Sequence, residues 1–370
     1  MERKLLLILL TLATAVLFVC GCTDDAAPSR KNAVYAALNT GSVPKAQIKV
    51  ALVFTSDGKG ERTAGGLASS GLERAVKRFG EQIETCYVEF ADPTLDASNT
   101  FRDLARDGWD LIFVLGFQFA ESVSQVRSEF LDTKFVLVDG WIPGLDKDSN
   151  VMCVSYREHE GSFLIGAAAA LRSKTGRIGF IGSIRGPWIE RFEAGFVAGA
   201  KTVNPKIIYS VDYVGLTLES LANATKAKEL ALKQYNAGID VIYHAAGGSY
   251  IGVVEAATAR RKLVIGAGSD HALASSDAQR PYILTSMLKR VDLLVFETID
   301  KFAAGKFEGG YALLGLAEGG VGYAVNQFNQ EVMDELGPEL EELKAKIISG
   351  EIAVPANNHE LRSYLGRIGG

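Results

Sequence analysis

The chain of 370 residues places groups that could bind a polar small molecule at the ends of short aliphatic runs. These groups are carboxylates, aromatic rings, one lysine, and glycines whose backbone amides a ligand can approach closely. Carboxylates and ammonium groups hydrogen-bond hydroxyls, whereas aromatic side chains stack on flat rings. The mixture therefore suits a polar ligand that contains a ring. The candidate ligand-binding residues at these ends are Asp57, Phe117, Asp139, Trp141, Arg185, Gly247, Gly248, Ser249, Tyr250, Asp270 and Lys289.

Catalytic, phosphate-binding and metal-binding sites need spacings that the chain lacks. The stretch 57–63 (DGKGERT) matches neither GxxxxGK[ST] nor GxGxxG, and Ser249 in GGSYIG misses the GxSxG elbow. His159 lies in EHEG rather than HExxH, so we expect a surface or capping residue. His244 ends a predicted strand, and we expect it to be buried with its hydrogen bonds satisfied. The sequence predicts a binding protein with no catalytic residue, no metal and no cofactor.

The elements that must position the candidate residues follow an α/β pattern. Runs apolar on both faces predict parallel sheets that helices cover on both sides, and about ten strands divide into two doubly wound sheets. We place the break after a helix at 161–174. Ligands of such sheets bind beyond the carboxyl ends of the strands, where the candidates lie. The predicted strands are 49–55, 83–90, 110–116, 134–140, 150–156, 177–183, 206–214, 240–248, 262–270 and 282–287.

Composition limits the class of protein. The chain is 48% hydrophobic with a net charge of −5, which excludes a disordered chain and disfavours a globally basic nucleic-acid binder. Its length favours two lobes over one very large core. Cys86 and Cys153 lie in strand-like runs, where cysteine usually behaves as a small buried hydrophobe, so we expect both to be unpaired.

The first 22 residues read as an export signal. Arg3 and Lys4 precede an apolar run, 5–19, that is shorter than the roughly 20 residues of a spanning helix. The run ends in VCGC, which resembles a bacterial lipobox with Cys22 as the lipid-accepting residue. An ordinary cleaved signal or an anchor helix is the alternative. We expect 23–47, which is polar, to be a flexible tether.

Several long segments resemble the basic membrane protein (BMP) family of bacterial ABC-transporter substrate-binding lipoproteins, which includes the purine-nucleoside receptors. The resemblance spans residues 48 to 356. The segments that carry it are DLIFVLGFQFAE (110–121), KFVLVDG (134–140), EHEGSFLIGAAAALRSKTGRIGFIG (158–182), ERFEAGF (190–196), HAAGG (244–248), LTSMLKRVD (284–292), GLAEGGVGYA (315–324) and ISGEIAVP (348–355).

The resemblance implies a type I periplasmic-binding-protein fold, in which two Rossmann-like lobes are joined by a three-segment hinge and close on a small molecule. The expected N-terminal lobe is 48–174 plus 291–311, and the C-terminal lobe is 175–290 plus 312–370. The expected crossovers lie near 174–177, 289–291 and 312–316. We expect an amphipathic helix pair over 326–349, packed on the second lobe.

The resemblance also implies roles for some candidates. Asp139 stands where the family places a carboxylate on ribose hydroxyls, although an aspartate before a glycine also forms turns. Asp270 and Lys289 would contact base and sugar, and Lys289 could pair with Asp270 when no ligand is present. Gly247 and Gly248 would bring backbone amides to the ligand, or serve helix entry. Phe117 would pack on the ligand or under its loop.

Two departures from the family leave the exact ligand open. The family usually reads DxGxxDKSFNQSAWEG after the first strand, with Phe on the base and Asn on the sugar, but here Ala64 and Gly65 occupy those places. Gly268 likewise replaces an Asp. Another ring must substitute, or the ligand differs from a purine nucleoside. Rings that could substitute lie in strand-end loops, namely Trp141, Trp188 and Tyr250.

These patterns predict an extracytoplasmic solute-binding lipoprotein of an ABC importer that captures a nucleoside-like or nucleobase-like molecule. Its expected partners are that small molecule and an ABC permease. We expect a monomer, held at the cell membrane only by its lipid anchor, facing the periplasm or the cell exterior, and binding no nucleic acid. A surface receptor or sensor that uses the same clamp for another small heterocycle or sugar is the alternative. A third hypothesis is an enzyme built on the same fold.

Overall fold

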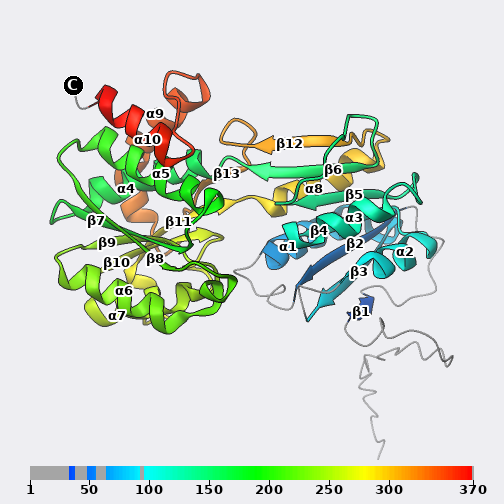
Figure 1. The fold of residues 1–370 in the computed structure, drawn as a ribbon, viewed down its shortest axis with the longest axis horizontal. Coiled ribbons are helices and arrows are strands. Elements are labelled where there is room, and N and C mark those ends of the chain that lie inside the picture. Colours follow the sequence, from blue (N-terminus) through cyan, green and yellow to red (C-terminus); the bar gives the residue numbers. More distant parts are fainter. Residues whose placement is uncertain (1–32, 38–47, 56–63, 92–95, 369–370) are drawn as a thin grey trace, which may run out of the picture.

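The computed structural model describes residues 33–37, 48–55, 64–91 and 96–368, and these form two α/β lobes (Figure 1). The expected signal, 1–22, including Cys22, lies outside the described residues. Within the described residues, no helix combines the length and the apolar character needed to cross a membrane. Cys86 and Cys153 are buried and free, which confirms the expectation that they are unpaired.

The first lobe is built on a seven-stranded sheet. Five of its strands are parallel in the doubly wound order β3-β2-β4-β5-β6, with β1 antiparallel at one edge and β12 parallel at the other. Helices α1 and α8 pack on one face, and α2 and α3 on the other. The strands are β1 (Ala33–Ala37), β2 (Ile48–Thr55), β3 (Ile83–Phe90), β4 (Leu111–Leu115), β5 (Lys134–Val138), β6 (Val151–Tyr156) and β12 (Gly310–Leu314), and the helices are α1 (Ala64–Phe79), η2 (Gly80–Gln82), α2 (Ser98–Arg106), η3 (Phe117–Phe119), α3 (Ala120–Val126) and α8 (Val291–Ala303).

The second lobe repeats the same winding. Its parallel strands run in the order β11-β10-β9-β7-β8, with β13 antiparallel on the β11 edge. The strands are β7 (Arg177–Ile184), β8 (Ile208–Gly215), β9 (Val241–Ala245), β10 (Leu263–Gly268), β11 (Ile283–Lys289) and β13 (Val321–Tyr323), and the helices are α4 (Glu158–Arg172), α5 (Pro187–Val203), η4 (Leu218–Ala222), α6 (Ala224–Asn236), η5 (Gly247–Ser249), α7 (Tyr250–Arg260), η6 (Arg280–Tyr282), α9 (Gln330–Ile348) and α10 (Asn358–Ile368).

The chain crosses between the lobes after β6, after β11 and after β12. Short hydrogen bonds tie these crossovers to one another: the Arg157 amide donates to the Leu314 carbonyl at 2.9 Å, and the Arg290 amide donates to the Gly320 carbonyl at 2.8 Å. The buried Glu160 carboxylate accepts from the Leu316 amide at 2.8 Å. The three segments therefore form one bonded hinge.

The lobe boundaries differ from the expected ones at α4. This helix lies against α5, β11 and β13 of the second lobe, so the first crossover precedes α4 instead of following it. Glycines make the α4–α5 contact close. A Cβ atom on Gly166 would lie 1.9 Å from the Phe196 carbonyl oxygen, and one on Gly199 would lie 1.9 Å from the Phe163 carbonyl oxygen. Only glycine permits this approach, which binds α4 to the second lobe.

Residues 312–314 also belong to the first lobe instead of the second, because the strand that contains them, β12, pairs with β6 and completes the first sheet. The expected tether contains a strand as well, since β1 pairs with β3 and covers its edge.

The expected helix pair over 326–349 is the single helix α9, with Pro338 inside it. Proline removes one helical hydrogen bond. The buried stripe of Leu336, Leu340 and Leu343 nevertheless keeps the helix continuous, and α9 packs on α4 of the second lobe as expected.

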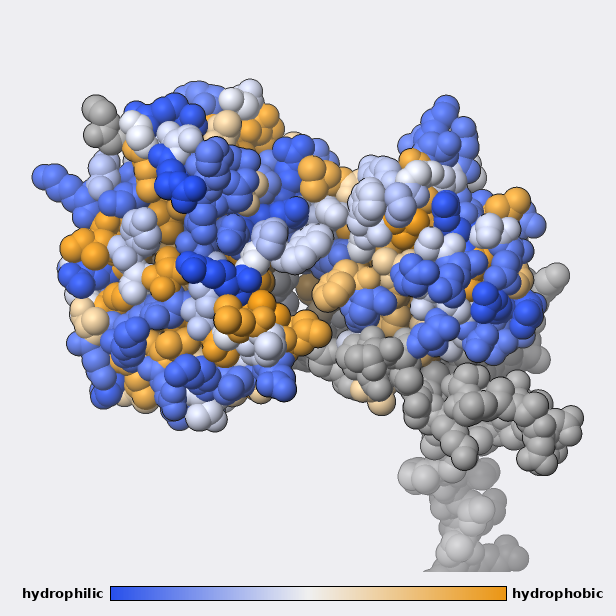
Figure 2. All heavy atoms as spheres, viewed as in Figure 1, coloured by the Kyte–Doolittle hydropathy of each residue, from blue (hydrophilic) through white to orange (hydrophobic). Residues whose placement is uncertain are grey.

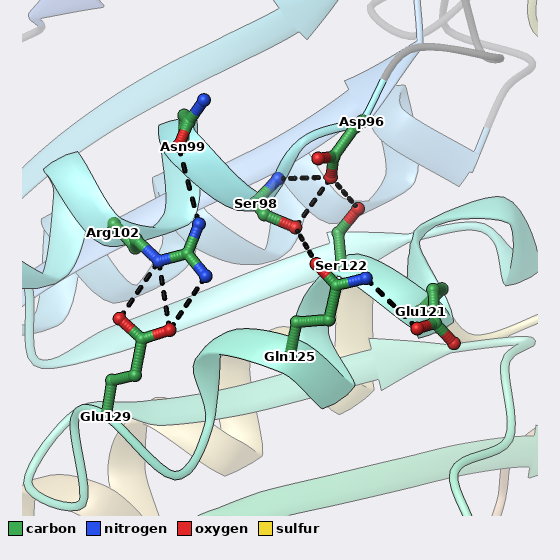
Figure 3. A network of polar contacts seen from close by, with 8 residues as sticks. All are labelled: Asp96, Ser98, Asn99, Arg102, Glu121, Ser122, Gln125 and Glu129. Atoms are coloured by element: carbon green, nitrogen blue, oxygen red, sulfur yellow. Dashed lines mark hydrogen bonds and ion pairs between the residues drawn. The ribbon is translucent and has the colours of Figure 1, made fainter.

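A polar network holds α2 against α3, which pack on the same face of the first sheet (Figure 3). The Asp96 carboxylate accepts hydrogen bonds from the Ser98 amide and hydroxyl and from the Ser122 hydroxyl. Two guanidinium nitrogens of Arg102 on α2 donate hydrogen bonds to the Glu129 carboxylate at 2.7–3.0 Å. The two hydrogen bonds from Ser98 lower the pKa of Asp96 most, and the hydrogen bond from Ser122 lowers it further.

Candidate ligand-binding cleft

An ion pair joins the two lobes where the carboxyl ends of their strands meet. Lys289 ends β11, and its Nζ lies 2.8 and 2.7 Å from the two carboxylate oxygens of Asp139, which follows β5. The molecular surface is hollowed between the lobes (Figure 2). The sheets therefore present their carboxyl ends to a common cleft, as the sequence predicted.

Two further groups lie against the Lys289 ammonium, and a third lies beyond one of them. Glu158, at the start of α4, places Oε1 at 3.4 Å from Nζ, and the Tyr156 ring centroid lies 4.7 Å from the same atom. Arg191 of α5 approaches the other Glu158 oxygen at 3.5 Å. Only 16% of the Lys289 side chain and 8% of the Glu158 side chain are exposed, so the ammonium is held largely out of water.

The electrostatics of this cluster keep the lysine charged. Burial alone would lower the pKa of Lys289, but the nearby carboxylates of Asp139 and Glu158 outweigh it and raise that pKa. Burial, reinforced by the charges of Asp139, Asp292 and Glu158, raises the pKa of Tyr156 well above its usual value. At neutral pH the cleft therefore offers a cation and carboxylates beside a neutral phenol.

Asp139 has a left-handed backbone, with φ at 61°. Its amide donates to the Val154 carbonyl at 2.9 Å, which anchors the turn to β6. A non-glycine residue in this region is uncommon, although aspartate tolerates it better than most. The strained turn aims the carboxylate at the opposite lobe, and such strain is commonly found at functional sites.

Asp270 does not pair with Lys289, contrary to expectation. One Asp270 carboxylate oxygen accepts from the Asn326 side-chain amide at 2.7 Å, and the other accepts from the Ala272 amide at 3.1 Å. Lys289 instead bonds Asp139 and Glu158, because these carboxylates lie at the hinge end of the cleft beside β11.

The loop after β9 brings four candidates together. Gly247 and Gly248 are exposed, and Gly247 has a φ of 56° that favours glycine. Ser249 is fully buried: its hydroxyl donates to the Ser220 carbonyl at 2.7 Å and accepts from the Asn223 amide at 2.6 Å. Ser249 thus ties η5 to η4, which favours a positioning role in the loop.

Tyr250, the fourth of these candidates, packs on two histidines instead of standing free in the loop. Its ring centroid lies 5.7 Å from that of His244, nearly parallel, and 4.6 Å from that of His271. His244 is buried as expected, but neither ring nitrogen has a hydrogen-bond partner within the described residues, so the expectation of a satisfied histidine is wrong. Burial, followed by the neighbouring His271, holds the pKa of His244 well below its usual range.

His159 is also more enclosed than expected. It lies within α4, half-buried, and its backbone packs directly on Gly195 of α5. Burial, followed by Arg191 and Arg157, lowers the pKa of His159 to about 4.

Residues 48–358 match the family described as ABC transporter substrate-binding protein, PnrA-like (Bmp). This chain belongs to the Bmp family. The family consists of non-enzymatic substrate-binding proteins of ABC transporters, which confirms the expected class and the absence of catalysis. As a Bmp protein, the chain has a ligand and a permease as its partners.

Named relatives of this Bmp protein agree with the family match. The chain is 33% identical over 322 residues to the CD4+ T-cell-stimulating antigen of Listeria monocytogenes, which covers 83% of this chain and 87% of that protein. It is 32% identical over 336 residues to the ABC transporter nucleoside-binding protein BmpA of Lactococcus lactis subsp. cremoris, with coverage of 86% and 92%.

Among solved structures, an ABC transporter solute-binding protein from Aeropyrum pernix superposes with a TM-score of 0.68 at 25% identity, covering 87% of this chain and 97% of that one. The expected type I periplasmic-binding-protein architecture is thereby confirmed.

The remaining candidates of this Bmp protein lie at the strand ends with exposed side chains. Phe117, after β4, is 58% exposed, and Trp188, at the start of α5, is also 58% exposed. Trp141 is 63% exposed and stacks on Tyr311 of the edge strand β12, with centroids 6.2 Å apart. Arg185 is exposed and lies 5.4 Å from the Tyr213 ring centroid. Their contact with a ligand stays a prediction.

Two candidate regions that follow the first strand contribute no described contact to the cleft. Asp57 lies outside the described residues. Ala64 and Gly65, which stand at the family's Phe and Asn positions, begin α1. Within the ranges that the structure describes, no group of three or more His, Cys, Asp or Glu could hold a metal ion.

Sequence reasoning missed Glu158, Tyr156 and Asn326. Glu158 begins the segment EHEG, and Tyr156 lies two residues before it. Both residues flank the first crossover between the lobes, so a correct placement of that crossover would have brought them to the cleft. Asn326 lies 56 residues from Asp270, and nothing in its local sequence pointed to the pairing. A cavity of about 500 Å³ between α8 and β12, with Leu294, Phe307 and Leu314 in its lining, was also not expected.

Proposed function

We propose that this Bmp protein captures a nucleoside-like or nucleobase-like molecule between its lobes and presents it to an ABC permease. The observation that carries the proposal is the Asp139–Lys289 pair, which joins the strand ends of the two lobes. A carboxylate accepts hydrogen bonds from two hydroxyls, and an ammonium donates to a hydroxyl or ring oxygen. Together they complement the vicinal hydroxyls of a ribose. The Lactococcus relative is itself named a nucleoside-binding protein.

Ligand binding favours the closed arrangement of the lobes. A molecule that touches both Asp139 and the η5 glycines bonds more groups in the closed state than in the open one, so it shifts the population towards closure. The permease then distinguishes loaded from empty protein by the relative position of the lobes.

The proposal includes the location of the protein. A lipid on Cys22 would hold the chain at the cell membrane, on the periplasmic or exterior side, and the signal-like pattern of residues 1–22 supports this. Mass spectrometry of the N-terminal peptide tests the modification. We expect a diacylglyceryl group on Cys22, and release of Cys22→Ala from the membrane fraction; an unmodified Cys22 in membrane-bound protein would contradict the anchor.

A thermal-shift screen of the full chain tests the ligand class. The panel contains purine and pyrimidine nucleosides, free bases, simple sugars and amino acids. A thousandfold excess of ligand over the dissociation constant stabilises the folded state by about 4 kcal/mol, so a true ligand raises the melting temperature clearly. We expect hits among nucleosides or bases. Hits confined to sugars or amino acids would overturn the nucleoside proposal while leaving the binding-protein class intact.

A further inference from the structure

We propose that Glu158 is a positioning residue for Lys289: it holds the ammonium charged and aimed into the cleft whether or not Asp139 is engaged by a ligand. The inference rests on the proposed function, because it takes Asp139 and Lys289 to be the polar contacts of the ligand.

The contacts of Glu158 fit this task. One carboxylate oxygen faces the Lys289 ammonium at 3.4 Å, and the other faces Arg191 at 3.5 Å. The oxygen that faces Arg191, Oε2, accepts no hydrogen bond from the residues that the structure describes, so the ion pair with Arg191 is its main polar contact there. The Glu158 side chain is 8% exposed and faces a cation at each carboxylate oxygen. It therefore balances the charges of Lys289 and Arg191 within the second lobe.

The place of each group in the fold separates the two partners of Lys289. Asp139 belongs to the first lobe, whereas Glu158 and Lys289 both lie at the ends of second-lobe elements. The Lys289–Asp139 pair therefore depends on how the lobes sit, but the Lys289–Glu158 pair moves as one unit with α4 and β11. When ligand hydroxyls bond Asp139, or when the lobes separate, Glu158 still balances the ammonium.

The surrounding charges are consistent with a balanced site. Around Lys289 stand two carboxylates, Asp139 and Glu158, the phenol of Tyr156 below it, and the guanidinium of Arg191 beyond Glu158. Asp292 of α8 is engaged separately, because both of its oxygens bond the Arg290 guanidinium at 2.9 Å. Removing the Glu158 charge leaves a largely buried lysine with a single carboxylate, which favours loss of its proton.

The test follows the titration of Lys289 and the binding of adenosine and cytidine, two probes that stay uncharged between neutral pH and about pH 10. The variants are Glu158→Gln and Glu158→Asp, and the matched control is Glu193→Gln, which removes another buried carboxylate of the second lobe. The full chain is used throughout. Nuclear magnetic resonance of the lysine side chains, assigned with Lys289→Arg, reports the Lys289 pKa without any ligand.

We expect the pKa of Lys289 to fall in the order wild type, Glu158→Asp, Glu158→Gln, and to stay unchanged in Glu193→Gln. We expect nucleoside affinity in Glu158→Gln to weaken about tenfold between pH 7.5 and 10, because one proton is then needed for binding, while wild type changes little. If Glu158→Gln does not fold, the aspartate variant decides by the same titration.

An unchanged Lys289 titration in the Glu158 variants overturns the inference, as does an affinity loss that is equal at every pH. Failure of both nucleosides to bind wild type at any pH counts against the proposed function instead. In that case the ligand-free titration still decides the role of Glu158.

Discussion

The charged contacts between the two lobes concentrate in a few residues at the hinge end of the cleft. Lys289 and Asp139 are 150 positions apart in the sequence, yet their side chains bond at 2.7 Å. Each group costs free energy to remove from water, and each lowers that cost for the other. A ligand that replaces part of the pair must offer equivalent polar contacts, which selects for hydroxylated molecules over purely apolar ones.

Asp139→Asn should separate sugar from base recognition. The substitution keeps the size of the side chain and its tolerance of the left-handed backbone, but it removes the charge. Hydrogen bonds to charged groups contribute about 1.5–3 kcal/mol, so we expect a nucleoside to bind about 10- to 100-fold more weakly. Its free base should change less than about threefold. Isothermal titration calorimetry with matched nucleoside and base measures both, and equal losses would assign Asp139 to the turn alone.

Cys86 and Cys153, the two cysteines among the described residues, should be unreactive in the folded protein. Burial, reinforced by the charge of Glu84, raises the pKa of the Cys86 thiol to about 12, and burial also raises the pKa of Cys153. Because the thiolate is the reactive form, both should resist a thiol reagent at neutral pH and react together on unfolding. Ellman's reagent with and without denaturant measures this in the variant Cys20→Ala/Cys22→Ala, which leaves Cys86 and Cys153 as the thiols that can react. Rapid labelling of either cysteine in native protein would contradict the buried placement.

At the scale of elements, the sequence predicted the strands whose residues are buried on both faces. The runs at 83–90 and 177–183 correspond to β3 and β7 almost residue for residue. β12 was missed because it is an edge strand: Tyr311 and Leu313 are about half exposed, so the apolar run is broken. β13 has only three residues, too few for a periodic signal.

The positions of the candidate site residues, like the buried strands, could be predicted from the sequence, but their pairings could not. Strand ends point to one edge of a sheet, so Asp139 and Lys289 could be placed at the cleft from sequence. Which carboxylate pairs with Lys289 depends on how the second sheet lies against the first. The local sequence pattern contains no information about that arrangement. The pairing of Asp270 with Asn326, and the choice of Glu158 over Asp270, needed the structure.

Glycine substitutions should distinguish the α4–α5 contact from ordinary helix surface. A Cβ on Gly199 would lie 1.9 Å from the Phe163 carbonyl oxygen, so Gly199→Ala forces the helices apart and should destabilise the protein by about 1–3 kcal/mol. The matched control is Gly366→Ala in α10, where nothing lies within 4 Å of the added atom. That change should stabilise by about 0.4–1 kcal/mol, because alanine has less freedom to lose on folding.

Urea unfolding of both variants measures the two free energies. Opposite signs support the close helix crossing. A neutral Gly199→Ala would mean that α4 and α5 separate easily, and α4 would then not bind the second lobe as firmly as the packing indicates.

At the scale of the whole molecule, the hinge joins both lobes through bonded crossovers, so motion of one lobe must be carried by a few backbone segments. The bond from the Leu316 amide to Glu160 fixes the third crossover to the first. Such a hinge permits rotation while keeping the strand ends aligned, which is what a clamp around a small molecule requires.

The stability of the molecule should fall steeply on the acid side of neutrality. His244 and His159 are held neutral by burial, with folded-state pKa values below the usual 6.5. A base with a depressed pKa in the folded state binds its proton first in the unfolded chain. The contribution of these two histidines to stability is therefore fully present above pH 6.5 and is lost as the pH falls below 6.5, down to about 4 for His159. Each such histidine contributes a slope of about 1.4 kcal/mol per pH unit.

The variant His244→Phe isolates the contribution of the His244 ring, whose nitrogens have no hydrogen-bond partner within the described residues. It keeps an aromatic side chain beside Tyr250 but cannot take a proton, so its free energy of unfolding should fall less steeply with acid than that of wild type, by that same slope. His359→Gln is the control, because His359 is exposed and has no such burial. Urea unfolding at a series of pH values from 7.5 to about 4.5 gives the three curves. If His244→Phe and wild type lose stability in parallel, His244 must find a proton-stabilising partner in solution, and the acid sensitivity must come from groups elsewhere in the fold.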